Sequence, residues 1–267
     1  MKLQFIRKYW GPWNWRKFAR EERGEGKDLF KELSNLDRSI LVAGCQRSGT
    51  SILTRALVQS PELSKFRTND DNELDGAYIL AGIGTVDESK RYCFQTTYLN
   101  ESYVEYFRHK GEYQLVWLIR NPYSVIYSML YNWLRYPLNE LFQSCGIGSL
   151  TKLEKEKYLR YGLLKIPPIK RACYAYVGKI NQLIEIRQAL DDSQLAVVDY
   201  DDLVTNSQGI LSALCDFLGL TYRFDYSNIM NLDSLRKAAM LTNTKRQIVQ
   251  RICQSSYDDA RLLLTIK

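Results

Sequence analysis

The chain has 267 residues, of which 45% are hydrophobic and 25% charged, and these fractions are typical of a globular protein. Six cysteines are scattered without a C-x-x-C pair, which argues against a zinc site or a disulfide framework and fits a reducing compartment. The one histidine, His109, lies among basic residues, so we expect a solvated side chain and no Ser-His-Asp triad. No metal site is expected.

The formal net charge of +7 suits a protein with a polyanionic ligand, because a basic cleft attracts anions. Nucleic acid or a membrane surface would fit the same charge, but the chain carries no periodic basic-aromatic array, so we expect no nucleic-acid partner. No apolar run approaches the ~20 residues of a membrane span, and no signal-peptide core follows the N-terminus. These features predict a cytoplasmic protein without stable membrane insertion.

Residues 1–23 combine aromatic with basic side chains, and Gly11-Pro12 divides them into two short pieces. We expect an N-terminal arm whose aromatic side chains pack on the main body. Contact with a membrane interface, or an aromatic flap over a ligand pocket, is the alternative. Residues 23–27 predict a flexible joint and residues 28–36 a short helix, so that residues 1–36 precede one domain over residues 37–267.

Residues 39–58 are the stretch around which the chain is organised. Residues 40–43 are apolar and partly β-branched, as in a buried strand, and from Ile52 onward apolar residues recur at the spacing of an amphipathic helix. A strand therefore turns into a helix across residues 44–51, which aims backbone N–H groups and the positive end of the helix at one point. The pattern predicts a phosphate-binding loop, and a capped turn without a ligand is the alternative.

Gly44 and Gly49 bracket four residues as in the nucleotide-triphosphate loop G-x-x-x-x-G-K-[ST], but Thr50 stands where that loop has lysine. The nearest cation comes three residues earlier, as Arg47. Loss of the lysine disfavours an ordinary Mg²⁺-dependent kinase. The loop instead resembles the 5′-phosphosulfate-binding loop of sulfotransferases that use 3′-phosphoadenosine-5′-phosphosulfate (PAPS), over Gln46-Arg47-Ser48-Gly49-Thr50-Ser51.

A second motif of that family follows about 70 residues later. Residues 114–120 predict a buried strand, and Pro122 suits the first turn of the next helix. Residues 118–128 closely resemble the motif in which an arginine and a serine hold the 3′-phosphate of PAPS, and Arg120 and Ser128 occupy those positions. The planar fork of donors on arginine suits phosphate.

A third resemblance lies in residues 194–220, which predict a strand and then a helix that ends in Phe-Leu-Gly-Leu. It makes Tyr200 a candidate adenosine contact, although a core residue fits the sequence equally. Arg236-Lys237 are candidates for a late basic clamp on the 3′-phosphate or are solvated charges, because the glycine that normally follows is absent. Ile52 replaces a frequent aromatic residue of the family, so adenine stacking is expected from elsewhere.

The acidic stretch after the first motif is the expected source of a general base. In branches of the family without a catalytic histidine, a glutamate in this region is the base, and this loose resemblance makes Glu73 the first candidate, Asp71 the second and Asp70 the third. A solvated charged loop is the alternative. Gln95 lies in a segment where many members carry Lys-Thr-Pro, so the family's second active-site cation is expected to be missing.

Residues 131–190 are mostly helical by pattern, with a mobile loop expected at residues 145–149 and one long amphipathic helix at residues 171–190. The resemblance as a whole covers residues 39–220. It implies an α/β three-layer sandwich with a central, mostly parallel sheet flanked by helices and a P-loop-like nucleotide-binding core.

The resemblance also implies transfer of a sulfonyl group from PAPS to a hydroxyl or amine, leaving 3′,5′-ADP (PAP), with no metal. It assigns catalysis to Arg47 with Glu73 or Asp71. The implied cofactor-binding residues are Gln46, Arg47, Ser48, Gly49, Thr50, Ser51, Arg120, Ser128 and Tyr200.

The acceptor is expected to be a neutral or cationic small molecule, such as an amine- or guanidinium-bearing alkaloid of the kind tailored in natural-product synthesis. Carboxylates near the reacting centre, and Gln95 in place of a lysine, favour that choice. Tyrosyl-protein and carbohydrate acceptors stay open, as do a phosphotransferase that uses ATP and Mg²⁺ and a non-catalytic nucleotide-binding protein.

Overall fold

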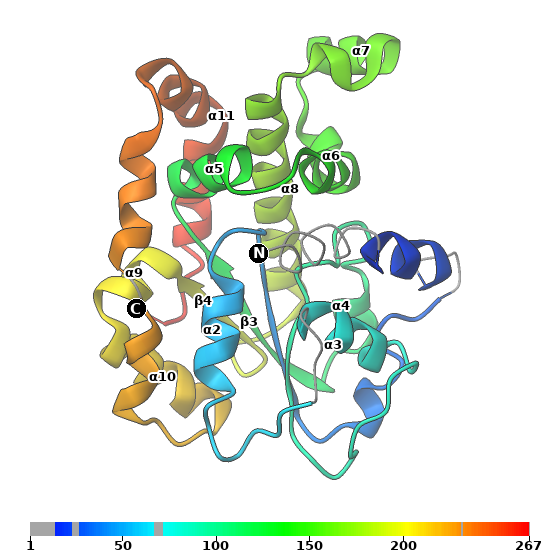
Figure 1. Cartoon of the computed structure of the whole chain (residues 1–267), viewed down its shortest axis with the longest axis vertical. Coiled ribbons are helices and arrows are strands. Elements are labelled where there is room, and N and C mark those ends of the chain that lie inside the picture. Colours follow the sequence, from blue (N-terminus) through cyan, green and yellow to red (C-terminus); the bar gives the residue numbers. More distant parts are fainter. Residues whose placement is uncertain (1–13, 23–26, 67–71, 231, 267) are drawn as a thin grey trace, which may run out of the picture.

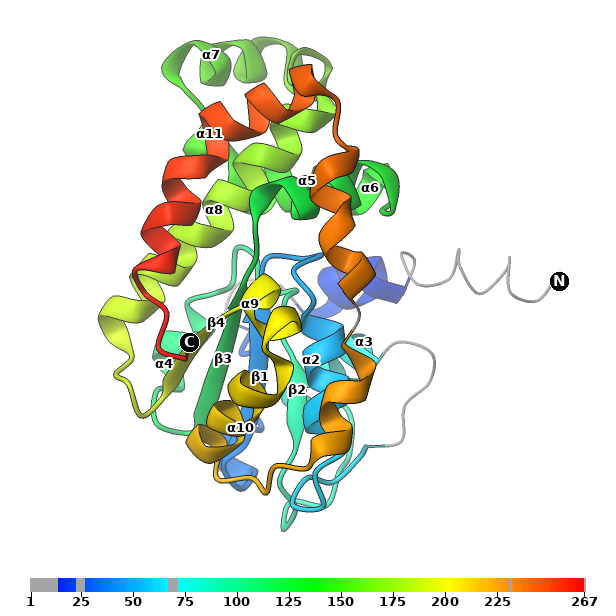
Figure 2. The same cartoon turned by 90° about the vertical axis from the view of Figure 1, so that its left-hand side faces the viewer.

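A parallel sheet of four strands lies at the centre of the protein, in the spatial order β2-β1-β3-β4 (Figures 1 and 2). The computed structural model describes the chain except for residues 1–13, 23–26, 67–71, 231 and 267. The strands are β1 (Ser39–Gly44), β2 (Cys93–Gln95), β3 (Tyr113–Ile119) and β4 (Leu195–Asp199). β1 and β4 are buried throughout, as expected for parallel strands covered on both faces, and the three strands predicted from apolar runs are confirmed.

Helices cover both faces of the sheet, which confirms the predicted three-layer sandwich. Ile40 and Val42 of β1 pack toward α2 (Thr50–Leu57) and α10 (Ser207–Leu218) on one face. Leu41 of β1 belongs to the core on the other face, with the long helices α8 (Pro168–Ala189) and α11 (Asn243–Arg261). The other labelled α-helices are α3 (Asn72–Leu80), α4 (Glu105–Arg108), α5 (Pro122–Tyr131), α6 (Arg135–Leu141), α7 (Lys152–Tyr161) and α9 (Tyr200–Thr205).

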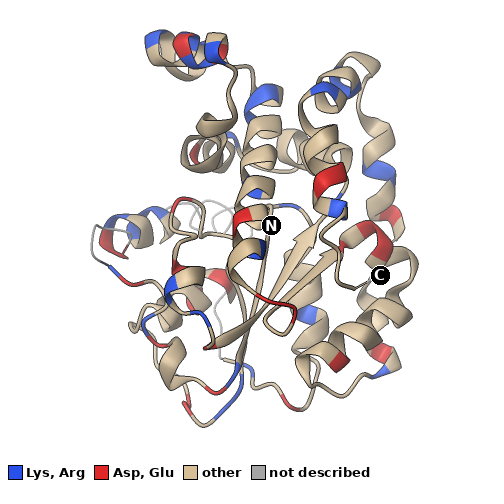
Figure 3. Ribbon diagram, turned by 180° about the vertical axis from the view of Figure 1, so that it is seen from behind, with Lys and Arg blue, Asp and Glu red and all other residues tan. Residues whose placement is uncertain are grey.

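The register of the strands brings their carboxyl ends to the same edge of the sheet. Val42 of β1 lies opposite Gln95 of β2 and Val116 of β3, and Leu118 of β3 lies opposite Val198 of β4. Charged side chains lie on the helices and connections, and Asp199 at the end of β4 is the one charged residue within the strands (Figure 3). In such open sheets ligands bind beyond the carboxyl ends of the strands.

The described part of the N-terminal arm, residues 14–22, is a helix that packs on the main body. Phe18 is fully buried, with its ring centroid 5.1 Å from that of Tyr78 and 5.8 Å from that of Tyr98. The alternative of a flap over a pocket also has support, since Trp15 lies tilted against Tyr98, with 5.3 Å between ring centroids, and lines a cavity at the carboxyl ends of the strands. The predicted joint at residues 23–27 lies mostly outside the described residues.

The prediction of a mobile loop at residues 145–149 is wrong. A π-helical turn (Phe142–Gly146) continues α6 and leads into a 3-10 turn (Ile147–Ser149). This segment packs tightly on α8, because a Cβ atom added to Gly178 would lie 1.9 Å from the carbonyl oxygen of Cys145. Two glycines in the segment suggested a loop, because a local sequence pattern does not show a packing partner such as Gly178, 33 residues from Cys145.

The predicted helix over residues 28–36 is also wrong, because this part forms only turns and a short 3-10 helix (Leu33–Asn35). Further 3-10 helices are Gly162–Lys165, Phe224–Ile229 and Leu232–Met240. The expectation of a solvated His109 fails too, since its side chain is buried between Asp28 and Glu112, each 2.9 Å from a ring nitrogen. Within the described part of the chain, every helix is too short or too polar to cross a bilayer.

Candidate active site

The loop between β1 and α2 has the shape of an anion-binding turn. Gly49 precedes the first turn of α2 with φ +99°, and Arg47 has φ +75°, which is rare for a residue with a side chain. A Cβ atom on Gly49 would lie 2.2 Å from the Tyr200 ring, so only glycine lets the loop approach that ring. The N–H groups of Ile52 and Leu53 donate to the Gly49 carbonyl, which leaves those of Thr50 and Ser51 at the start of α2 for an anion.

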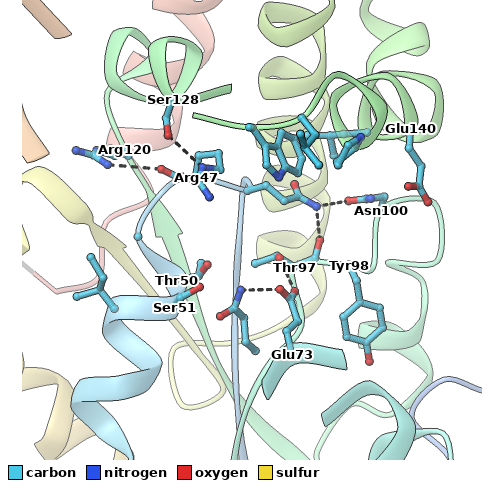
Figure 4. A pocket seen from close by; sticks show the side chains of 18 of the residues that line it. Arg47, Thr50, Ser51, Glu73, Thr97, Tyr98, Asn100, Arg120, Ser128 and Glu140 are labelled. Carbon is cyan, nitrogen blue, oxygen red and sulfur yellow. Dashed lines mark hydrogen bonds between the residues drawn. The ribbon is translucent and has the colours of Figure 1, made fainter. Parts of the chain in front are cut away.

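The loop forms one end of a cavity of about 490 Å³ (Figure 4). Its wall includes nearly all the residues named from the sequence, namely Gln46, Arg47, Gly49, Thr50, Ser51, Glu73, Arg120, Ser128 and Tyr200. Ser48 is fully buried and does not line the cavity. Asp70 and Asp71 lie outside the described residues.

Three cationic side chains, those of Arg47, Arg120 and Lys237, line this end of the cavity. Arg47 Nε donates to the Ser128 hydroxyl over 3.1 Å, and Lys237 reaches the same wall from the 3-10 helix Leu232–Met240. Burial and the charge of Arg120 lower the pKa of Arg47. Burial lowers the pKa of Lys237 as well, with further contributions from Arg120 and Arg47. A bound polyanion would relieve this mutual repulsion.

Arg120 is 2% exposed and is held in a fixed orientation. Its Nε donates to Asp201 over 3.2 Å, one terminal nitrogen donates to the Ser234 carbonyl over 2.7 Å, and the guanidinium lies 4.4 Å from the centroid of the Tyr200 ring. Helix α5, which carries Ser128, begins at Pro122 as predicted, and Asn121 caps it by accepting from the Ser124 N–H over 2.8 Å.

Three buried polar atoms of the cavity-lining residues at this end have no hydrogen-bond partner among the described residues. They are the hydroxyls of Tyr200 and Ser234 and the side-chain oxygen of Gln46, and the Ser48 hydroxyl is also unpaired but does not line the cavity. Buried polar groups are normally paired, so unpaired groups beside three cations fit a ligand rich in oxygen and nitrogen. Of the suggested late clamp, Lys237 faces the cavity, whereas Arg236 is 83% exposed and pairs with Asp233.

Glu73 lies across the cavity, in the first turn of α3. Its carboxylate accepts a hydrogen bond from Gln95 Nε2 over 2.7 Å and another from the Thr97 hydroxyl over 2.5 Å. Gln95, at the position where the resemblance led us to expect a lysine, therefore contacts the candidate base directly. Gln46 of the anion-binding loop donates to the Thr97 carbonyl over 2.8 Å and to the Asn100 side chain over 3.0 Å, and so connects the two halves of the cavity.

The other half of the cavity is mostly aromatic and apolar (Figure 4). Its wall consists of Trp15, Tyr98, Trp133, Leu134, Tyr136, Pro137, Leu141 and the carboxylate of Glu140. The guanidinium of Arg16 lies 3.8 Å from the centroid of the Tyr136 ring. Among the described wall residues, the lysines and arginines are confined to the opposite end with the anion-binding loop.

Sequence reasoning missed Thr97, Asn100, Ser234 and the residues of α6 that line the cavity. No local pattern marks them, because their roles depend on which segments the sheet brings together. The segment after β2 offered one signal, since it lies at the carboxyl end of a strand, where side chains commonly face a ligand.

A family model described as "Sulfotransferase domain" matches residues 37–258, whereas a search of curated proteins gives no match. Among solved structures, the fold is similar to the sulfotransferase domain from the curacin biosynthetic pathway (TM-score 0.53, 16% identity, covering 87% of this chain and 99% of that chain). It is also similar to the sulfotransferase domain of the Synechococcus PCC 7002 olefin synthase (TM-score 0.50, 13% identity, 91% and 97%). Mouse sulfotransferase SULT7A1 complexed with PAP is a third similar structure (TM-score 0.51, 13% identity, 89% and 93%). At these identities the structures establish the fold, and the family model, which spans most of the chain, establishes that the protein belongs to the sulfotransferase domain family.

Proposed function

We propose that the protein transfers a sulfonyl group from PAPS to a hydroxyl or amine of a small cationic acceptor. The convergence of Arg47, Arg120 and Lys237 beside Ser128 carries this proposal. PAPS has phosphate groups at both its 3′ and 5′ positions, which matches a site with more than one cation, a free helix N-terminus and unpaired hydroxyls.

The residues divide between two phosphate positions. Arg120, Ser128 and Lys237 lie at the cationic end of the cavity and suit the 3′-phosphate, and Arg47 contacts this group through its hydrogen bond to Ser128. The N–H groups before α2 and the hydroxyls of Thr50 and Ser51 suit the 5′-phosphosulfate. Tyr200, which is buried under Arg120, suits the nucleoside.

PAPS supplies the sulfonyl group, and the bond that breaks joins its sulfur to an oxygen of the 5′-phosphate, which is the leaving group. As the new oxygen–sulfur or nitrogen–sulfur bond forms, the departing phosphate keeps the electron pair of the broken bond, and the acceptor loses a proton. Glu73 takes that proton, because Gln95 and Thr97 hold its carboxylate in the cavity wall across from the anion-binding loop. Arg47 and the loop N–H groups stabilise the charge that grows on the phosphate.

The wall of the acceptor half supports a cationic acceptor with an apolar body. The aromatic rings of Trp15, Tyr98 and Trp133 can attract a cation through their faces, and Glu140 adds a negative charge. Tyr136 already has the guanidinium of Arg16 on one face of its ring. An acidic peptide or a sulfated carbohydrate would need positive side chains there. Free cysteines, five of them buried, are consistent with the reducing cytoplasm that we propose as the location.

The class of acceptor is tested by measuring sulfonyl transfer from labelled PAPS to three phenols of similar size. Tyramine is the cationic phenol, 4-ethylphenol the neutral one and 3-(4-hydroxyphenyl)propionate the anionic one. We expect kcat/KM to fall in that order, and Glu140→Gln to reduce the preference for tyramine over 4-ethylphenol by about 10-fold. Glu156→Gln, on the exposed α7, is the matched control. A preference for the anionic phenol, or an unchanged ratio in Glu140→Gln, would contradict the acceptor assignment.

A further inference from the structure

Lys179 of α8 is buried behind the candidate active site, with 1% of its surface exposed. Its ammonium donates to the carbonyl oxygen of Leu99 over 3.1 Å and to that of Thr97 over 3.4 Å, and lies 5.8 Å from the centroid of the Trp117 ring. A buried lysine is costly unless polar partners compensate it. Here the compensation comes mainly from a turn of the backbone, so Lys179 and that turn hold each other in place.

The turn in question, residues 97–100, connects the candidate base to the anion-binding loop. The Thr97 hydroxyl donates to Glu73, while the Thr97 carbonyl accepts from Lys179 and from Gln46. One helical turn beyond Lys179, Gln182 Nε2 donates to the Asn100 carbonyl over 2.5 Å. Side chains from α8 therefore fix both ends of the turn whose first residue positions the Glu73 carboxylate.

The titratable groups that face Lys179 come from four other segments. They are Glu73 of α3, Glu101 after the turn, Cys45 after β1 and Cys145 of the π-helical turn. Burial raises the pKa of both thiols, that of Cys145 to about 11, so neither carries charge near neutral pH. Burial lowers the pKa of Lys179, and its electrostatic interactions with Glu73 and Glu101 oppose that effect.

We propose that Lys179 is a positioning residue for sulfonyl transfer. By holding the turn at residues 97–100, it places the Thr97 hydroxyl against Glu73. Its ammonium also adds, from helix α8, a positive charge that the neutral Gln95 does not provide. The inference rests on the proposed function. Lys179 contacts Thr97, Thr97 donates to Glu73, and the electrostatic interaction of Lys179 with Glu73 adds a positive charge near a carboxylate whose neighbour on β2, Gln95, is neutral.

The test compares Lys179→Met with Lys170→Met, a matched control on the same helix. Lys170 is paired with Glu154 at the far end of α8. In Lys179→Met we expect kcat to fall by about 10- to 100-fold, as for a misplaced catalytic group, while the Kd for 3′,5′-ADP changes less than about 3-fold. The acid limb of the kcat–pH profile moves to higher pH, because Glu73 ionises less readily without a nearby positive charge. Lys170→Met leaves all three quantities unchanged.

Lys179→Gln distinguishes the effect of the hydrogen bonds from that of the charge. It also provides the test if Lys179→Met does not fold. It can still donate to the turn, so we expect a smaller loss of kcat with the same shift of the acid limb. A wild-type pH profile in both variants, or a loss of 3′,5′-ADP affinity as large as the loss of kcat, would overturn the inference in favour of a general structural role. Failure of the wild-type protein to bind 3′,5′-ADP would instead reject the proposed function.

Discussion

The guanidinium of Arg47 donates to the hydroxyl of Ser128 over 3.1 Å and thereby joins the loop after β1 to helix α5. This contact brings the two motifs found in the sequence together at one point in space. It also places the arginine of the first motif beside the position that we propose for the 3′-phosphate. In the proposed complex, Arg47 can therefore contribute to both phosphate positions.

Ser128→Ala tests whether this point binds the 3′-phosphate. We expect the affinity for 3′,5′-ADP to fall about 10-fold, in line with the loss of a hydrogen bond to a charged group, and the affinity for 5′-AMP to change much less. Calorimetric titration of each nucleotide provides the measurement. Ser227→Ala, which removes an exposed hydroxyl bonded to the Phe224 carbonyl, is the control. An equal loss for both nucleotides would mean that Ser128 does not recognise the 3′-phosphate.

Glu73→Gln tests the assignment of the base. Glutamine keeps the size of the side chain but cannot take up the proton of the acceptor, so we expect kcat to fall by about 10²- to 10⁴-fold with no change in the Kd for 3′,5′-ADP. Steady-state kinetics are compared with those of Asp75→Asn in the same helical turn, which should retain activity. Near-normal activity in Glu73→Gln would direct the search to Asp71.

Trp15→Ala tests whether the N-terminal helix shapes the acceptor pocket. Trp15 lies in the cavity wall and 5.3 Å from Tyr98 between ring centroids, so its loss removes aromatic surface from that half alone. We expect KM for the acceptor to rise about 10-fold with KM for PAPS unchanged. Arg20→Ala, at an exposed position of the same helix, should change neither value. A rise in KM for PAPS would show that Trp15 serves the nucleotide instead.

The cluster around His109 should make stability depend on pH. Burial opposes charging of His109, but its hydrogen bonds with Glu112 and Asp28 outweigh burial and raise its pKa. The resulting stabilisation is complete below about pH 6.5 and is lost as pH rises through the raised pKa. Burial raises the pKa of Glu105 to about 7, so its ionisation in the folded protein removes stability in the same direction.

We therefore expect the melting temperature to fall as pH is raised from 6 to 8, and to fall less in His109→Gln. Differential scanning calorimetry at constant ionic strength measures both slopes. Asp28, whose pKa is lowered by its backbone and His109 hydrogen bonds against the effect of burial, loses its contribution only in acid. A melting temperature that rises from pH 6 to pH 8, or identical slopes in the two proteins, would contradict this account.

The sequence predicted the central part of the fold because buried parallel strands are continuous apolar runs, as Ile40 to Ala43 illustrate. It also indicated the two motifs whose residues line one cavity in the structure, and their binding of phosphate stays a prediction. The predictions were wrong where the environment of a residue depends on a segment that is distant in the sequence. His109 looked solvated because Asp28 was not known to lie beside it, and the glycines at positions 146 and 148 looked mobile because α8 was not known to cover them.

The positioning contacts escaped prediction for the same reason. Lys179 is one of many lysines in the sequence, and only the fold brings its ammonium to the carbonyl oxygens of Thr97 and Leu99. Ser234 likewise reaches the cavity from a 3-10 helix whose sequence looks like a polar surface segment, whereas Lys237 of the same helix was one of two candidates from the sequence.

The central claim is that the cations around Arg120 bind the 3′,5′-bisphosphate of PAPS, and calorimetric titration tests it most directly. Wild type and Arg120→Lys are each titrated with 3′,5′-ADP and with ATP-Mg²⁺, with Arg236→Lys as a control at an exposed position. We predict binding of 3′,5′-ADP at about micromolar Kd and weak ATP binding in the wild type, and at least about 10-fold weaker 3′,5′-ADP binding in Arg120→Lys, since lysine keeps the charge but loses the planar fork of donors. Preference for ATP-Mg²⁺, or equal affinity for 3′,5′-ADP in wild type and Arg120→Lys, would contradict the claim.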